Sequence, residues 1–230
     1  MHIKHISIGR LTIPLKSAFT TAVRTTASLT DLVVTITTVD GAVGFGSAAL
    51  VPAVTGYDEA GVLAALERLT LFLFENNPDG PLTLAQKLSE KCLEAPPALA
   101  AMDTALYDLA AKNAGLPLAA FLGGTLAPIP ILATVSLAAP EVMAREAKHL
   151  LGRGFQTLKL KVGKGVTDDQ ERIEAVATRV PPSISLVLDA NQGWSQEEAH
   201  AMLTWLSRWP NIRLLEQPLA AADHQGLADL

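Results

Sequence analysis

Charged and amide side chains stand at the ends of three short apolar segments in the second half of the sequence. The first segment ends with Lys159-x-Lys161, the second with Asp189-x-Asn191 and the third with Glu216. Residues i and i+2 of a β-strand point to the same face, so the two lysines share one side, as do Asp189 and Asn191. If the segments are neighbouring parallel strands, these side chains converge at the carboxyl edge of the sheet, where α/β proteins carry their chemistry.

These residue types suit the removal of a proton alpha to a carboxylate. Asp189 and Glu216 supply the hard oxygen ligands that Mg²⁺ prefers. Lys159 and Lys161 repel each other if they lie close together, which should lower the pKa of one lysine and make it a base at neutral pH. The metal would stabilise an enediolate while the lysine takes the proton.

Each strand ending also has a simpler interpretation. A Lys-x-Lys pair is usually part of a solvated face, Asp-x-Asn is often a turn or a helix cap, and Glu-Gln-Pro can be a plain strand exit. Three such endings on successive apolar strands favour the functional interpretation.

The elements that would carry these residues alternate between strand and helix. We predict strands at 131–137, 157–162, 185–189 and 213–216, and helices at about 140–151, 168–179 and 196–209. Two of the helices should open with capping boxes, Thr167-x-x-Gln170 and Ser195-x-x-Glu198. The strands are apolar almost throughout, which is typical of a parallel sheet buried on both faces, so a βα barrel or a doubly wound sheet is expected.

The first half of the sequence predicts a small α+β domain. Strands are expected at 3–13, 32–38 and 42–47, and Asp40-Gly41 between the last two is a hairpin signal. The segment 16–30 has no clear period and is predicted to be a loop. Helices are predicted at 58–75, 82–92 and 97–113, the first ending at the breaker Asn77-Pro78-Asp79-Gly80. We place the domains at 1–125 and 126–230.

The composition excludes several classes of protein. The chain has 230 residues, 49% of them apolar and 18% charged, with a net charge of −5. It is globular in composition and lacks the basic surface of a nucleic-acid-binding protein. Cys92 is the only cysteine, which fits a reduced cytoplasmic location. No signal peptide or membrane span is evident, so neither export nor a membrane partner is expected.

At the strand ends the sequence resembles the enolase superfamily, in its muconate-lactonising branch. Residues 157–163 resemble the Lys-x-Lys motif of that branch, and 188–194 and 216–218 resemble its two metal-ligand strands. Residues 101–115 resemble the best-marked helix of the family's capping domain. The resemblance implies an α/β fold, with an α+β capping domain before a TIM-type barrel. It also implies Lys159 and Lys161 as catalytic residues, and Mg²⁺ on Asp189 and Glu216 with Asn191 supporting the ligands.

A narrower resemblance concerns the substrate. Residues 14–25 resemble the specificity loop of the alanine–glutamate dipeptide epimerases, and Val54-Thr55-Gly56 resembles a second loop of that group. This implies that Arg24 pairs with a side-chain carboxylate of the substrate, and that Thr134, Ser136 and Lys159 also contact the substrate. Alternatively, Arg24 is an ordinary exposed arginine and Thr134 is bonded to the backbone.

The predicted activity is therefore that of a Mg²⁺-dependent epimerase or racemase acting on dipeptides such as L-Ala-L-Glu, in a homo-oligomer. N-acylamino-acid racemase, o-succinylbenzoate synthase and muconate cycloisomerase are alternatives within the superfamily. One departure is Gly46-Ser47-Ala48, where the branch usually has Gly-Glu-Ala. The loss of that carboxylate can alter the preferred dipeptide.

The length of the chain adds a further expectation. A βα barrel needs about 250 residues, whereas 100 residues follow position 130. The resemblance implies a third metal-binding carboxylate on a fifth strand and a second catalytic lysine on a sixth, both beyond Leu230. We therefore expect the chain to be incomplete, and an inactive fragment is the alternative from a different class.

Overall fold

The computed structural model describes residues 2–76, 80–91 and 95–230. Cys92 and the predicted break at Asn77-Pro78-Asp79 lie outside the described residues. The chain divides into two compact units. Unit 1 comprises Met1–Pro14 and Ser28–Pro128, and unit 2 comprises Leu15–Ala27 and Ile129–Leu230.

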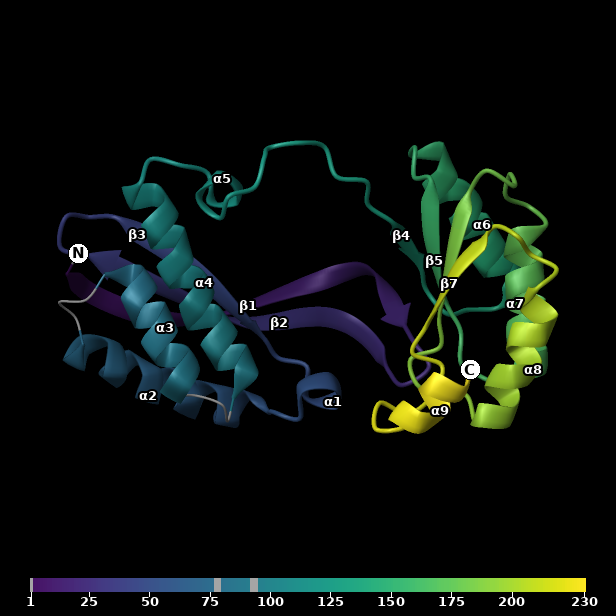
Figure 1. The fold of residues 1–230 in the computed structure, drawn as a ribbon, viewed down its shortest axis with the longest axis horizontal. Helices are drawn as coiled ribbons and strands as arrows, with labels where there is room; N and C mark the ends of the chain where they lie inside the picture. The colour runs from purple at the N-terminus through teal and green to yellow at the C-terminus, as the bar shows by residue number, and fades with distance from the viewer. Residues whose placement is uncertain (1, 77–79, 92–94) are drawn as a thin grey trace. The chain divides into compact units, whose positions relative to one another are not determined.

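The first three strands form one sheet in the order of the sequence (Figure 1). They are β1 (Ile3–Thr20), β2 (Thr25–Thr38) and β3 (Val43–Ala49). Strands β2 and β3 are antiparallel. Between them Gly41 has φ of 89°, a left-handed conformation that glycine adopts without strain. The predicted Asp-Gly hairpin is confirmed.

The prediction of a loop over 16–30 is wrong. Strand β1 continues to Thr20 and β2 begins at Thr25, so most of the segment is strand. The segment is rich in threonine, and β-branched side chains favour extended backbone. Pairing between β1 and β2 satisfies backbone groups that a loop would leave to water, and the absence of an apolar period concealed this pairing.

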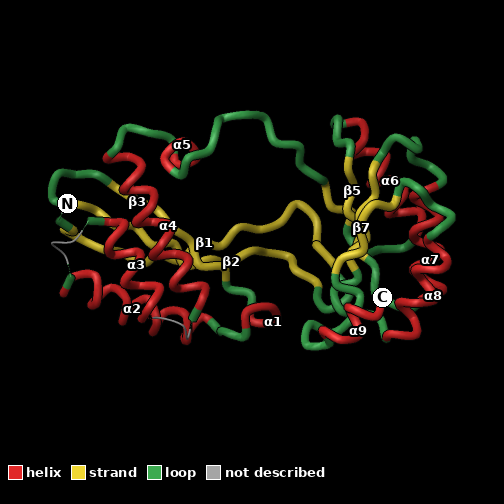
Figure 2. The backbone as a smooth tube through the Cα atoms, viewed as in Figure 1, coloured by secondary structure: helices red, strands yellow, loops and turns green. Residues whose placement is uncertain are grey.

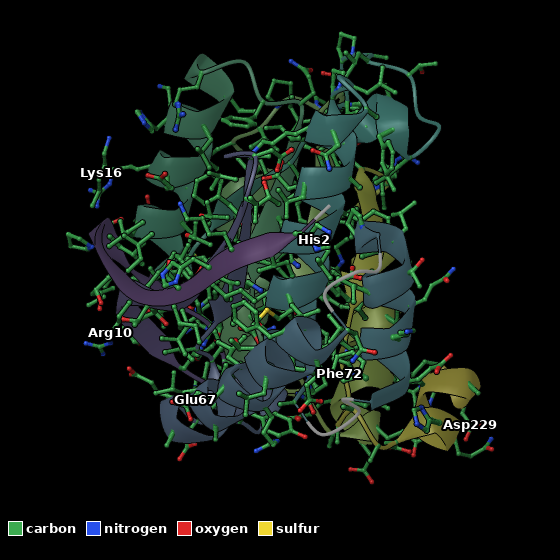
Figure 3. The ribbon with its side chains drawn as sticks, turned by 90° about the vertical axis from the view of Figure 1, so that its left-hand side faces the viewer. His2, Arg10, Lys16, Glu67, Phe72 and Asp229 are labelled. Carbon is green, nitrogen blue, oxygen red and sulfur yellow. The ribbon has the colours of Figure 1, made fainter. Side chains whose placement is uncertain are left out.

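The long helices of unit 1 cover one face of its sheet. They are α1 (Pro52–Thr55), α2 (Glu59–Glu75), α3 (Pro81–Lys91), α4 (Pro96–Asn113) and α5 (Leu118–Phe121). Helices α2, α3 and α4 lie side by side over the sheet (Figure 1). On α2, Glu67 is exposed while Phe72 packs against the apolar core (Figure 3). The three long helices predicted from periodicity are confirmed within the described residues.

Helix α4 and strand β3 approach each other closely at a glycine. A Cβ atom added to Gly46 would lie 2.8 Å from the carbonyl carbon of Ala101. Real Cβ atoms do not come so close to backbone, so a larger residue would force the helix away from the sheet. The core beneath is apolar, with the fully buried side chains Val34, Ile36, Leu106 and Leu109 among its members.

Unit 2 contains a four-stranded sheet (Figure 2). Its strands are parallel and their order follows the sequence. Its strands are β4 (Ala133–Val135), β5 (Thr157–Lys161), β6 (Ser185–Asp189) and β7 (Ile212–Glu216). Its helices are α6 (Pro140–Gly152), α7 (Val166–Ala177), α8 (Gln196–Leu206) and α9 (His224–Asp229). The predicted fold class, an α+β region followed by parallel strand–helix units, is confirmed, although β4 is shorter than predicted.

One of the two predicted capping boxes is present. Ser195 accepts from the Glu198 amide and the Glu198 carboxylate accepts from the Ser195 amide. The box at Thr167 is wrong, because α7 begins at Val166 with Gly165 as its cap, two residues before the predicted cap. The Gly165 cap contributes no side-chain hydrogen bond. Within the described ranges, none of the helices combines the length and the apolar composition that a membrane span needs.

Candidate active site

The strand register places three of the predicted residues in one row at the carboxyl edge of the parallel sheet. Lys161 lies directly opposite Asp189, and Asp189 lies opposite Glu216. Lys159, two residues earlier on β5, shares the face of Lys161 and lies opposite Thr134. Pairing of the successive strands β5, β6 and β7 thus brings together the side chains of Lys159, Lys161, Asp189 and Glu216, which span 57 positions of the sequence.

Two ammonium groups share one carboxylate oxygen. Lys161 Nζ lies 2.5 Å from Asp189 Oδ2, and Lys159 Nζ lies 2.8 Å from the same oxygen. Lys159 Nζ also lies 2.6 Å from Glu216 Oε2. The Asp189 side chain is 1% exposed and that of Lys161 9%, whereas Glu216 is 46% exposed. One cation therefore reaches both carboxylates at once, in a site that is dry on the Asp189 side and open to water on the Glu216 side.

The charges of this cluster stabilise one another. Burial acts to lower the pKa of Lys159, but the carboxylates of Asp189 and Glu216 outweigh it, so this pKa lies above its usual value. Burial acts to raise the pKa of Asp189, but hydrogen bonds from Lys159, Lys161 and the Asn191 amide outweigh it and lower this pKa. Repulsion was expected to lower the pKa of one lysine; Lys159 does not behave in this way, because its ammonium group is paired with both carboxylates.

The backbone beyond β6 and β7 adopts an unusual conformation. Asn191, Gln192 and Gln217 have φ of 46°, 69° and 42°, a left-handed region that residues other than glycine seldom enter. The turn directs the Asn191 amide to Asp189 Oδ1 at 3.0 Å. The side-chain oxygen of Asn191 is buried and has no hydrogen-bond partner among the described residues. Such strain, kept beside a buried carboxylate, is typical of functional sites.

The donors present fit a divalent cation. Asp189 and Glu216 already converge on a single positive group, the Lys159 ammonium. The unpartnered oxygen of Asn191 adds a neutral oxygen beside them. Carboxylate and amide oxygens are the ligands that Mg²⁺ accepts. In the part of the chain that the structure describes, no group of three or more His, Cys, Asp or Glu side chains could hold a metal, so this chain contributes two carboxylates.

Arg24 lies in the turn between β1 and β2, within unit 2. The Thr21 amide donates to the Arg24 carbonyl at 2.9 Å, and the Arg24 amide donates to the Thr21 hydroxyl at 3.3 Å. Thr21 is buried and so fixes the turn. Across the described ranges the Arg24 guanidinium makes no hydrogen bond or ion pair, and its residue is partly exposed. A fixed backbone thus presents a positive group without a partner.

Sequence reasoning missed Phe19. The Lys161 ammonium lies 5.9 Å from the centre of the Phe19 ring, within the range of a cation–π contact. Phe19 stands in the segment that was predicted to be a loop. The hydrogen bonds of the adjacent Thr20 with Ser136 and Leu137 hold this segment at the end of β4, and no local pattern in the sequence indicates them.

Ser136 bonds to the same segment. Its hydroxyl accepts from the Thr20 amide at 2.7 Å and donates to the Thr20 carbonyl at 3.2 Å, while the Leu137 amide donates to that carbonyl at 3.0 Å. These bonds hold the end of β1 against the end of β4. Thr134 is partly exposed and lines, with Phe19 and Ser136, a pocket of about 390 Å³. Contact of Thr134 and Ser136 with substrate stays a prediction.

Comparison with known families agrees with this geometry over both halves of the chain. Residues 5–123 match the family described as mandelate racemase / muconate lactonizing enzyme, N-terminal domain. Residues 142–230 match the family described as enolase C-terminal domain-like. The two matches together cover most of the chain, including every residue of the strand-end row.

Individual relatives have similar sequences and folds. The L-Ala-D/L-Glu epimerase of Clostridium acetobutylicum is 37% identical over 229 residues, which are 99% of this chain and 64% of that protein. Two solved structures superpose with a TM-score of 0.93 each, over 99% of this chain and 64% of theirs. One is the dipeptide epimerase of Enterococcus faecalis with Mg and L-Leu-L-Tyr, 35% identical. The other is the substrate-liganded L-Ala-D/L-Glu epimerase of Bacillus subtilis, 36% identical.

The chain spans about 64% of the length of these relatives. Within that span the identity exceeds one third and the TM-score of 0.93 shows the same fold. The chain therefore belongs to the mandelate racemase and muconate lactonizing enzyme family of the enolase superfamily.

Proposed function

We propose that the whole protein is a Mg²⁺-dependent epimerase that removes and returns the proton alpha to a carboxylate in a dipeptide. The observation that carries the proposal is the row Lys161–Asp189–Glu216, with Lys159 bridging the two carboxylates. The names of the relatives support the same chemistry. The activity, its substrate and its metal are proposed for the whole protein, because the chain spans only part of the length of those relatives.

Asp189 and Glu216 would hold the metal ion, with Asn191 beside them. When bound, Mg²⁺ supplies the positive charge that stabilises the substrate carboxylate as its alpha proton leaves. Asp189 is buried and hydrogen-bonded by the Asn191 amide, so its position is fixed before any ligand arrives. Preorganised charges of this kind are effective because they need no rearrangement during the reaction.

The two lysines have different environments, and we assign them different roles. Lys159 has a raised pKa, so it stays an ammonium group and is suited to hold the negative charge of the substrate carboxylate. Lys161 lies deeper, with its ammonium group against Asp189 and the Phe19 ring. We assign proton transfer to Lys161 Nζ, on one face of the alpha carbon. Phe19 would shield that transfer from water.

The Arg24 guanidinium favours a substrate dipeptide whose second residue is acidic. Its guanidinium has no partner within the described residues and stands on a turn fixed by Thr21. Guanidinium–carboxylate pairing is strong and geometrically specific. The apolar dipeptide bound by the Enterococcus relative is the competing preference. A cytoplasmic location, a homo-oligomer and the division into a capping domain (1–125) and a catalytic domain (126–230) are further parts of the proposal.

A substrate panel in D₂O tests the proposal. The purified whole protein with Mg²⁺ is incubated with L-Ala-L-Glu, L-Ala-L-Leu and an N-succinyl amino acid, and deuterium at the alpha carbon is measured by mass spectrometry. We expect the fastest exchange with L-Ala-L-Glu, and none after chelation of the metal. Faster exchange with the N-succinyl compound would make the protein an N-acylamino-acid racemase. No exchange with any of the three would refute the proposal.

A further inference from the structure

Asp169 is a fully buried carboxylate that the proposed chemistry does not use. Its exposure is 0%, yet it accepts four hydrogen bonds. Oδ2 accepts from the amides of Gly163 and Lys164 at 2.8 and 2.9 Å and from the indole N–H of Trp194 at 2.9 Å. Oδ1 accepts from the Arg172 guanidinium at 2.8 Å. We call these five residues the Asp169 cluster.

The donors to Asp169 come from the loops after β5 and β6 and from Arg172 of helix α7. Gly163 and Lys164 follow β5, two and three residues after Lys161. Trp194 follows β6, three residues after Asn191. Arg172 also donates, through Nε, to the Ala138 carbonyl at 3.1 Å, in the loop after β4. A single carboxylate thus connects the carboxyl ends of β4, β5 and β6, where the candidate active site lies.

These loops are also in direct contact, so a shift in one must move the next. A Cβ added to Gly193 would lie 2.7 Å from the Gly163 Cα atom. A Cβ added to Gly163 would lie 2.9 Å from the Ala22 Cβ atom, in the turn that carries Arg24. The backbone at Gly163 is therefore confined between the loop after β6 and the turn of Arg24.

From these contacts we propose that Asp169 is a positioning residue for the candidate active site. It fixes the loops after β5 and β6, and through them the relative positions of Lys161 and Asp189. A buried ion pair seldom stabilises a fold more than well-packed apolar side chains of the same volume. All the hydrogen bonds of Asp169 go to the strand-end loops and to Arg172, so the cluster orders the site rather than the core. The catalytic part of this inference rests on the function proposed above.

The first arm of the test is independent of activity. Asp169→Asn keeps the shape of the side chain but removes its charge. Asp168→Asn is a matched control on the same helix, because Asp168 is 63% exposed and makes only a 3.5 Å ion pair with Arg172. Hydrogen exchange of the Gly163 and Lys164 amides should accelerate by about tenfold or more in Asp169→Asn. It should stay unchanged in Asp168→Asn, and the amides of Leu186 and Leu188 should stay protected in both variants.

Unchanged exchange at Gly163 and Lys164 in Asp169→Asn would overturn the proposal. A uniform acceleration across β5 and β6 would also overturn it, because Asp169 would then support the fold as a whole. If Asp169→Asn does not fold, Trp194→Phe removes one donor while keeping a ring in the core. That variant should accelerate the same two amides by a smaller factor, and equal protection in Trp194→Phe and the unmutated protein would overturn the proposal.

The second arm measures positioning in the whole Mg²⁺-loaded protein. The rate of alpha-proton exchange is compared for the two epimers of the dipeptide. A loss of folded protein lowers the exchange rates of both epimers equally. Displacement of the loop after β5 lowers one of these rates more than the other, namely the rate that depends on Lys161. We expect the ratio of the rates to change by about threefold or more in Asp169→Asn. An unchanged ratio would overturn the catalytic part. Absence of exchange in the unmutated protein would refute the proposed function, and the amide measurement would then decide the loop-holding role alone.

Discussion

The interiors of the two units differ in what they bury. Among the described residues, unit 1 buries one polar side chain, Thr38, in an otherwise apolar core. Unit 2 also has an apolar core, but its buried polar side chains are Thr21, Lys161, Asp169, Asp189 and Asn211. Three of these are charged. Burying charge opposes folding unless every charge finds a partner. Apolar packing therefore explains which side chains unit 1 buries, but it does not explain the buried charges of unit 2.

The backbones differ in the same way. Within the described ranges, the residues other than glycine with positive φ are Asn191, Gln192 and Gln217, all in unit 2. They lie one to three residues after a strand that ends in a carboxylate. Conformational strain and buried charge therefore coincide at one edge of one sheet. This coincidence distinguishes a candidate site from an ordinary core, and it can be tested by substitutions in each unit.

The largest effect on stability is expected at Asp189. Asp189→Ala leaves two buried ammonium groups without their shared carboxylate and should lower the free energy of unfolding by about 3–5 kcal/mol. Urea denaturation followed by circular dichroism measures the change. Asp229→Ala is the control, because Asp229 is exposed (Figure 3) and accepts only from the Gln225 side chain. A loss below 1 kcal/mol at Asp189 would mean that the buried charges are not coupled.

A smaller effect, on catalysis alone, is expected at Arg24. Arg24→Met should lower kcat/KM for L-Ala-L-Glu by roughly 30- to 150-fold, about 2–3 kcal/mol, because the substrate carboxylate loses its partner. Turnover of L-Ala-L-Leu should change little. Equal losses on both dipeptides would mean that Arg24 holds the turn instead of recognising the substrate.

In unit 1 the sensitive position is one of packing. Gly46→Ala places a methyl group against the Ala101 carbonyl and should destabilise the protein by about 1–3 kcal/mol through overpacking. Gly9→Ala is the matched control on a strand of the same sheet, since nothing lies within 4 Å of an added Cβ there. Thermal denaturation compares the two variants. Equal melting temperatures would show that β3 and α4 are not in tight contact.

The smallest expected effect is a pH dependence of stability. The pKa of Lys159 is raised in the folded protein, so its contribution is full below its usual pKa and is lost as the pH rises through the folded value. The pKa of Asp189 is lowered, so its contribution is present above its usual pKa and is lost as the pH falls through the folded value. The stability difference between the protein and Lys159→Met should therefore be greatest between about pH 4 and 10. It should stay below about 1 kcal/mol, because Lys161 still pairs with Asp189 in the variant and Glu216 is exposed. A difference that is constant across this range and beyond it would contradict the assignment.

The sequence predicted those parts of the fold that depend on local pattern. The Asp-Gly hairpin, the helices of unit 1 and the four parallel strands follow from turn chemistry and periodicity. The strand-end row also followed, because parallel strands bring their carboxyl ends together. Strands 16–20 and 25–30 were missed, since their pairing depends on a partner rather than on an apolar period.

Residues of the candidate site were also missed where their contacts depend on folding rather than on a local pattern. Phe19 was missed because its contact with Lys161 joins segments that are far apart in the sequence. Asp169 was missed because a helical aspartate followed three residues later by an arginine is ordinary, and its link to Trp194 forms only on folding. The Thr167 box is absent because Gly165, two residues earlier, is the cap of α7. Repulsion between the lysines was predicted to lower the pKa of one of them, whereas pairing with both carboxylates raises the pKa of Lys159.

The central claim is that Lys161 transfers the alpha proton on one face of the substrate. The direct measurement is deuterium incorporation at the alpha carbon of each epimer of Ala-Glu, in the whole protein and in its Lys161→Ala variant. The account predicts that the variant loses exchange from one epimer by about a thousandfold or more and keeps measurable exchange from the other. Exchange from both epimers at the rate of the unmutated protein would contradict it.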